Sequence, residues 1–172
     1  MKASRLFVFS LAFSALAAPS AAPASPGSTS FKITGYEYAF TSTVGSFAGR
    51  GGGNAGDMGF WNAVVQHDRL GSKSSFVNGG SFVITVKKAT GGLDAVAGTF
   101  THHGGTITTL RPGANCTNQQ YRVTAKLQDV LTTTSSGGSG TLLATLTHYR
   151  VRLFGHCVAI KARVAGSVSF TY

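Results

Sequence analysis

Apolar and polar side chains alternate with a period of two along almost the whole chain after residue 30, and this pattern constrains the fold most. An extended strand places successive side chains on opposite faces, so alternation lets one face be buried. The clearest runs have apolar residues at Tyr36, Tyr38 and Phe40; Phe82, Ile84 and Val86; Tyr121, Val123, Ala125 and Leu127; Tyr149, Val151 and Leu153; and Val164, Gly166, Val168 and Phe170. The pattern predicts an all-β protein.

Turn residues divide these runs at regular places. The turn signals are Asn78-Gly79-Gly80, Gly91-Gly92, His103-Gly104-Gly105, Pro112-Gly113 and Ser136-Gly137-Gly138. Helices lack their usual surface residues, because Glu37 is the single Glu of the chain. We expect one antiparallel β-barrel of about 8–10 strands, since closure removes exposed sheet edges. A two-sheet β-sandwich is the alternative.

The N-terminus reads as a secretory signal peptide over residues 1–24. Lys2 and Arg5 precede an apolar run at residues 6–18, and small residues follow at Ala22-Pro23-Ala24. The apolar run is too short to span a bilayer, so we expect no transmembrane segment. Residues 25–30 are then a flexible leader and residues 31–172 a single β domain. The protein is predicted to be secreted, either outside the cell or into a periplasm.

Two cysteines, Cys116 and Cys157, are the only thiols of the chain. In an oxidising compartment the expected outcome is one disulfide bond. Their separation does not match a C-x-x-C redox or metal motif, so we predict that the bond is structural.

The chain is basic, with a formal net charge of +10 at pH 7. Alternation puts His148, Arg150 and Arg152 on one face of a strand, and Arg122 and Lys126 on a similar face of another. If these strands are neighbours, a basic stripe results. The stripe would bind an anionic polymer or surface, with nucleic acid, acidic polysaccharide and anionic lipid as the open alternatives. A solvated, positively charged outer face is the competing interpretation.

A small apolar ligand in the mouth of the barrel is the other binding hypothesis. Trp61, the single Trp, together with Tyr36 and Tyr38, would line the pocket. The chain carries no G-x-S-x-G or S-x-x-K motif, and we expect no cofactor and no metal. A non-catalytic binding protein is therefore the leading interpretation, and the sequence leaves the oligomeric state open.

Two other classes of function remain. The first is a small secreted barrel enzyme, either an isomerase or cyclase, or a phosphodiesterase using His102 or His103 with His148, Lys126 and Arg150. The second is a secreted inhibitor or toxin-like interaction protein that presents a glycine-rich loop next to Arg50. That loop, residues 51–56, satisfies G-x-G-x-x-G, but a strand-like run rather than a helix follows it, which disfavours nucleotide binding.

Overall fold

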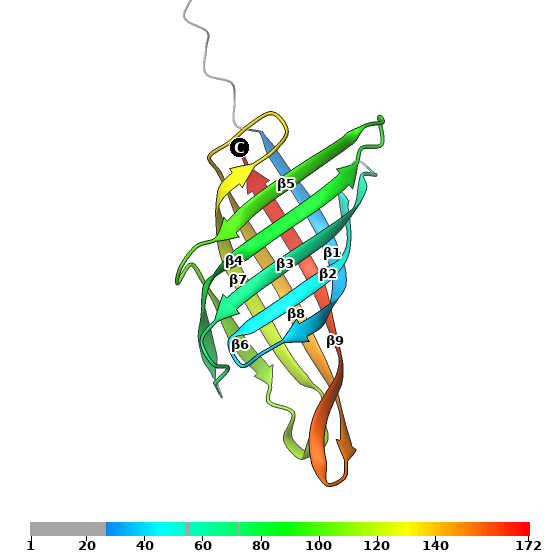
Figure 1. Ribbon diagram of the computed structural model, residues 1–172, viewed down its shortest axis with the longest axis vertical. Coiled ribbons are helices and arrows are strands. Elements are labelled where there is room, and N and C mark those ends of the chain that lie inside the picture. Colours follow the sequence, from blue (N-terminus) through cyan, green and yellow to red (C-terminus); the bar gives the residue numbers. More distant parts are fainter. Residues whose placement is uncertain (1–26, 54–55, 72) are drawn as a thin grey trace, which may run out of the picture.

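A computed structural model describes residues 27–53, 56–71 and 73–172, and most of them lie in strands (Figure 1). A short 3-10 turn, η1 (Ala114–Cys116), lies between the sixth and the seventh strand. The strands of these residues are β1 (Ser28–Phe40), β2 (Val44–Gly53), β3 (Met58–His67), β4 (Ser74–Lys87), β5 (Leu93–Phe100), β6 (Gly105–Arg111), β7 (Gln119–Leu131), β8 (Gly138–Leu153) and β9 (His156–Thr171).

The strands close into an antiparallel barrel of eight strands with one additional strand. The ring runs β1-β2-β3-β4-β5-β7-β8-β9 and returns to β1. The ninth strand is β6. β5 and β6 together occupy a single position of the ring, because each of them pairs with β4 on one side and with β7 on the other. Residues 74–77 of β4 pair with β6, and residues 81–87 pair with β5. The predicted barrel is confirmed, and the alternating pattern explains it, since closure buries one face of every strand.

Aromatic side chains fill the half of the interior where β1 begins and β9 ends, which we call the filled half. Phe82 is stacked on Trp61 with ring centroids 5.8 Å apart, and its ring is also 5.9 Å from that of Phe170. Phe31 meets Phe170 edge to face at 6.4 Å. All four rings are buried. Such pairs add to the free energy gained from burial alone, so this half is the stable core of the barrel.

The first strand starts earlier than the alternating pattern indicates. β1 begins at Ser28, which pairs with Thr171 of β9, so residues 28–30 belong to the sheet and not to a leader. Ser and Thr are tolerated in strands, and the pairing of β1 with residues 163–171 of β9 completes the closure. The predicted signal peptide, residues 1–24, and residues 25–26 lie outside the described residues.

At the other end, β8 and β9 extend beyond the barrel as a hairpin (Figure 1). A disulfide between Cys116 and Cys157, with Cα atoms 5.5 Å apart, joins this hairpin to the η1 turn. The predicted disulfide is therefore confirmed. Because Cys157 pairs with Arg152, close to the Phe154–Gly155 turn, the bond holds the outer part of the hairpin against the segment that connects β6 to β7.

Candidate ligand pocket in the barrel

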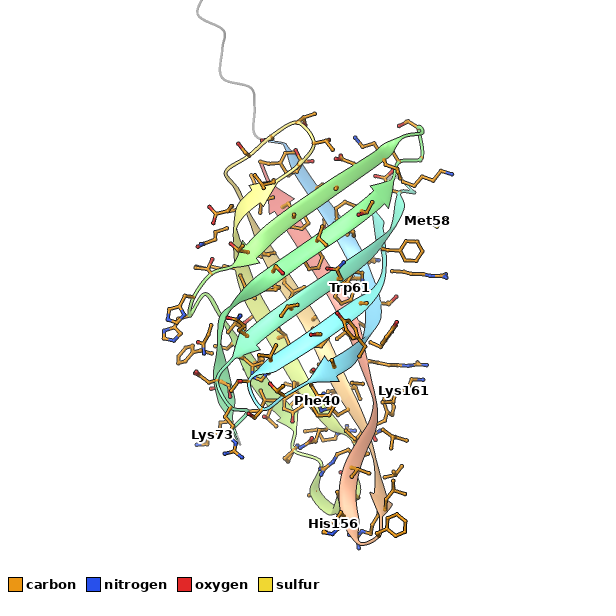
Figure 2. All side chains as sticks on the ribbon, in the orientation of Figure 1. Phe40, Met58, Trp61, Lys73, His156 and Lys161 are labelled. Atoms are coloured by element: carbon orange, nitrogen blue, oxygen red, sulfur yellow. A yellow bond between two sulfur atoms is a disulfide. The ribbon has the colours of Figure 1, made fainter. Side chains whose placement is uncertain are left out.

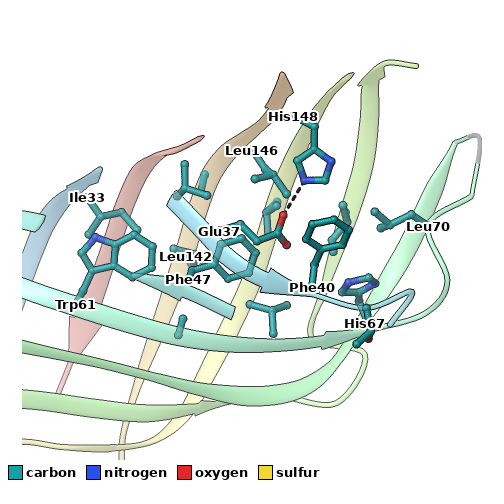
Figure 3. Close-up of a pocket in the computed structure, with 17 residues that line it drawn as sticks. Ile33, Glu37, Phe40, Phe47, Trp61, His67, Leu70, Leu142, Leu146 and His148 are labelled. Carbon is teal, nitrogen blue, oxygen red and sulfur yellow. Dashed lines mark hydrogen bonds and ion pairs between the residues drawn. The ribbon is translucent and has the colours of Figure 1, made fainter. Parts of the chain in front are cut away.

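A cavity occupies the half of the interior opposite the filled half, and we call this the open half (Figure 3). Its volume is about 80 Å³. Most of its wall is apolar, with Ile33, Phe47, Leu142 and Leu146 among the lining residues, and Phe40 lies at its mouth. The ionisable side chains in the wall are Glu37, His67 and His148.

Glu37 and His148 form an ion pair across the barrel interior. Oε2 of Glu37 lies 2.8 Å from Nε2 of His148, and the two side chains are only 5% and 11% exposed. An ionised carboxylate only accepts hydrogen bonds, so Nε2 of His148 donates this one when Glu37 is ionised. Because β9 lies between β1 and β8 in the sheet, the contact is made through the interior and not along neighbouring strands.

Two aromatic rings flank His148. Tyr121 of β7 meets the imidazole edge to face at 5.5 Å, and Phe40 is tilted against it at 6.2 Å. Burial raises the pKa of Tyr121; the positive charge of Arg150 opposes this shift and the negative charge of Glu37 adds to it. The Tyr121 hydroxyl therefore holds its proton to a higher pH than an exposed tyrosine does.

His67 ends β3 at the mouth of the cavity and is also buried. Its Nδ1 lies 2.7 Å from the carbonyl oxygen of Asp68. A carbonyl only accepts, so Nδ1 carries the proton and, in the neutral ring, Nε2 is left as an acceptor. Within the described part of the chain no group of three or more His, Cys, Asp or Glu side chains could hold a metal ion.

Trp61 contributes apolar surface to the cavity and no free donor. Its Nε1 donates to the carbonyl oxygens of Thr34 and Arg50, each at 3.1 Å. The ring fits because residue 35 is Gly, and a Cβ there would lie 2.8 Å from Cζ2 of Trp61. Of the three predicted pocket residues, Trp61 lines the cavity.

The other two, Tyr36 and Tyr38, lie on the outer wall with 53% and 59% of their surface exposed. The inward residues of β1 are instead Phe31, Ile33 and Glu37. The aromatic residues of this run were expected to face inward. Glu37 faces inward in place of the two tyrosines, because it has a buried partner in His148. Phe40, which follows the register shift between Glu37 and Ala39, does reach the mouth of the cavity.

The predicted basic stripe is not gathered on one surface. Arg122 and Lys126 are exposed on β7, whereas His148 faces the cavity. Arg150 is half-buried and its Nη1 donates to the carbonyl of Gly113 at 3.0 Å. Arg152 lies on the hairpin opposite Cys157. β7 pairs with β8 only as far as His148, so Arg150 and Arg152 lie beyond the closed ring, on the projecting hairpin, and apart from Arg122 and Lys126.

A different set of cations meets on the outer wall of β9, β1 and β2. A groove there is lined by Tyr36, Arg50, Lys161 and Arg163. The register places Tyr36 beside Arg163, and Arg50 beside Phe60 with its guanidinium 5.8 Å above the Phe60 ring. Sequence reasoning missed this set because β9 is far from β1 and β2 in the chain. Arg50 itself lies within β2, and Asn54 and Ala55 of the predicted loop lie outside the described residues.

The remaining histidines lie elsewhere. His102 and His103 occupy the β5–β6 turn with their rings stacked at 4.0 Å, and His103 lies 5.0 Å from the ring of exposed Phe76. Nδ1 of His102 is 3.0 Å from the carbonyl oxygen of Asn78. These rings are on the outside of the wall, whereas His148 is inside. The structure therefore does not assemble the predicted phosphodiesterase set.

No protein-family model matches the chain, and neither a curated protein nor a solved structure matches it. Across the described residues, no helix has the length and apolar character that a membrane crossing requires.

Proposed function

We propose that this is an exported binding protein whose barrel holds a small, mainly apolar molecule and binds its polar group with Glu37 and His148. One observation carries the proposal: a buried carboxylate–imidazole pair faces an apolar cavity. Burying such a pair costs free energy through desolvation, so its presence in a pocket favours a functional role over a structural one. The disulfide supports an oxidising compartment.

The pair suits a ligand with one hydroxyl or carbonyl group. Hydrogen bonds between described residues engage Oε2 of Glu37, and Oε1 can accept one from a ligand hydroxyl. The apolar wall then contacts the rest of the molecule, which is the usual division of labour in small-molecule sites. A cavity of about 80 Å³ is smaller than the roughly 150 Å³ apolar cavity that holds benzene, so a ring-sized ligand must extend past Phe40 into the mouth.

The single Trp gives a direct test, because Trp61 lines the cavity. We would titrate the purified protein with 1-naphthol and with naphthalene and follow the intrinsic fluorescence of Trp61. Both should perturb it, and Glu37→Gln should weaken 1-naphthol binding about tenfold while leaving naphthalene nearly unchanged, since one charged hydrogen bond is lost.

Two further experiments decide whether the ligand binds in the cavity or on the outer wall of the barrel. Ala144→Phe, which fills the cavity, should abolish the fluorescence response, whereas Ala165→Phe on the exposed face of β9 should not. Binding in the cavity should hardly depend on salt, while binding to outer cations falls steeply as salt rises. A response that survives Ala144→Phe, or that salt removes, would disprove the proposal.

A second candidate function, proton-transfer catalysis by an isomerase or cyclase, is favoured by the geometry of the same pair. Glu37 would remove a proton from a carbon next to a carbonyl and return it to another carbon, and His148 would hold the carboxylate in place. The test is deuterium uptake from heavy water into a β,γ-unsaturated ketone, followed by NMR. Uptake abolished by Glu37→Gln would establish catalysis, and the absence of uptake by a protein that binds the ketone would leave the binding function alone.

A further inference from the structure

The hairpin that projects from the barrel ends in a fully exposed aromatic residue. Phe154 and Gly155 form a two-residue turn between the paired residues Leu153 and His156, and their φ angles are 49° and 82°. Turns with two positive φ angles favour Asn or Gly at the first position, and a bulky side chain there is strained. The Phe154 side chain is nonetheless 100% exposed. Turn stability does not account for Phe at this position, and such strain concentrates at functional sites.

One face of the hairpin is apolar and open. The register pairs Val151 with Val158 and Leu153 with His156, so these side chains share a face. Leu153 and Val158 are exposed. The opposite face is occupied, because Cys157 is bonded to Cys116 and Arg150 donates to the carbonyl of Gly113. The hairpin is therefore braced on one side and presents apolar side chains on the other.

The charged residues of the hairpin and of the wall next to it are basic. No Asp or Glu follows Asp129 in the sequence. The same stretch carries the cations Arg150, Arg152, Lys161 and Arg163. Figure 2 shows His156 at the outer end of the hairpin and Lys161 nearer the barrel. The one acid of the barrel interior in this half, Glu37, is already paired with His148. A partner whose surface complements the hairpin tip is therefore anionic and able to accept apolar side chains.

We propose that the tip of the β8–β9 hairpin docks on an anionic lipid bilayer, with Phe154 and Leu153 entering the headgroup region and Arg152 and Lys161 binding lipid phosphates. Amphipathic elements with apolar and basic side chains bind membrane interfaces in this way, to a depth of about 5–10 Å. A pointed two-residue tip suits insertion into a fluid interface. A stable protein interface instead needs roughly 800 Å² from each partner, much more than this tip offers.

Docking of the hairpin tip would also set the position of the cavity relative to the bilayer. The docking proposal does not depend on the proposed ligand. The strand ends that surround the mouth, at Phe40 and His67, lie at the same end of the barrel as the hairpin (Figures 1 and 3). Docking through Phe154 therefore brings the mouth near the bilayer, where apolar molecules partition. A failure of membrane binding would leave the Trp61 titration unaffected.

The test is co-sedimentation of the purified protein with vesicles. Mixed phosphatidylcholine–phosphatidylglycerol vesicles should bind the protein, and pure phosphatidylcholine vesicles should bind it much more weakly. Phe154→Ser should reduce binding to the mixed vesicles about tenfold or more, because a large apolar side chain is lost from the interface. Phe60→Ser is the matched control, since Phe60 is also exposed but lies on the wall of the barrel. Arg152→Gln combined with Lys161→Gln should remove the preference for anionic lipid.

Several outcomes would overturn the proposal. These are equal binding to both vesicle types, equal loss with Phe154→Ser and Phe60→Ser, or no sedimentation with either vesicle. Sedimentation velocity adds another: a dimer that Phe154→Ser dissociates would assign the tip to a second copy of the chain. If Phe154→Ser fails to fold, Leu153→Ser and the charge variant give the same comparison on a hairpin that keeps its turn.

Discussion

The filled and open halves of the barrel use the same alternating strands but complete their interiors by opposite means. In the filled half, Phe31, Phe82 and Phe170 occupy the space between the walls. In the open half, a cavity remains and two ionisable groups, Glu37 and His148, face each other in it. Aromatic packing stabilises a fold, whereas a cavity and a buried ion pair do not. The difference indicates that the filled half provides stability and the open half provides function.

The largest expected effect is in the filled half. Phe82→Ala removes a ring that is 1% exposed and that contacts both Trp61 and Phe170. We expect the free energy of unfolding, measured in urea, to fall by about 3–5 kcal/mol. A loss below about 1 kcal/mol would show that this half is not the stable core.

The ion pair should behave differently. His148→Leu leaves Glu37 buried without its partner, and we expect a loss of about 3 kcal/mol. Replacing both groups, as Glu37→Met with His148→Leu, should restore the stability of the original protein or exceed it, while 1-naphthol binding stays lost. Urea unfolding of the single and double variants tests this. A double variant less stable than His148→Leu would mean that the pair serves the fold.

A smaller effect on stability, which depends on pH, is expected from Tyr121, whose ring lies against His148 of the ion pair. Its folded pKa is raised above the ordinary value of 10.0, chiefly by burial, so the unfolded chain releases this proton more readily. Stability from this group is thus fully present below pH 10 and is lost as the pH rises through the folded pKa. Arg150→Gln should raise the pKa further and Glu37→Gln should lower it, as followed by phenolate absorbance against Tyr121→Phe. Shifts of opposite sign would contradict the arrangement.

The smallest effect concerns the hairpin. Phe154→Asn places a residue that tolerates a positive φ in the turn and should stabilise the protein by up to about 1 kcal/mol. Urea unfolding measures this gain, with Phe60→Asn as the control on the barrel wall. A loss of stability would mean that the Phe154 ring makes contacts that favour the fold.

Much of the fold could be predicted because its signals are local. Alternation at Phe82, Ile84 and Val86 requires only that one face be buried, and glycine pairs mark the turns. The predicted signal peptide and the number of cysteines were enough to predict the Cys116–Cys157 bond. These inferences need no knowledge of which strand lies beside which.

The site could not be predicted in the same way, because it depends on distant pairings. Alternation alone gives Tyr36 and Glu37 equal claims to the interior, and the choice is decided by His148, 111 residues away. Similarly, Arg150 keeps the alternation of β8 but donates to the carbonyl of Gly113, 37 residues away in the chain, and no period-two pattern indicates this partner. A lone Glu within an aromatic run was the available signal for the buried pair.

The most direct test of the account is an NMR titration of the five histidine rings with 1-naphthol. We predict that the ring signals of His148 and His67, which line the cavity, shift with one common affinity, while those of His102 and His103 on the outer turn do not move. Shifts confined to His102 and His103, or no shift at all, would contradict it.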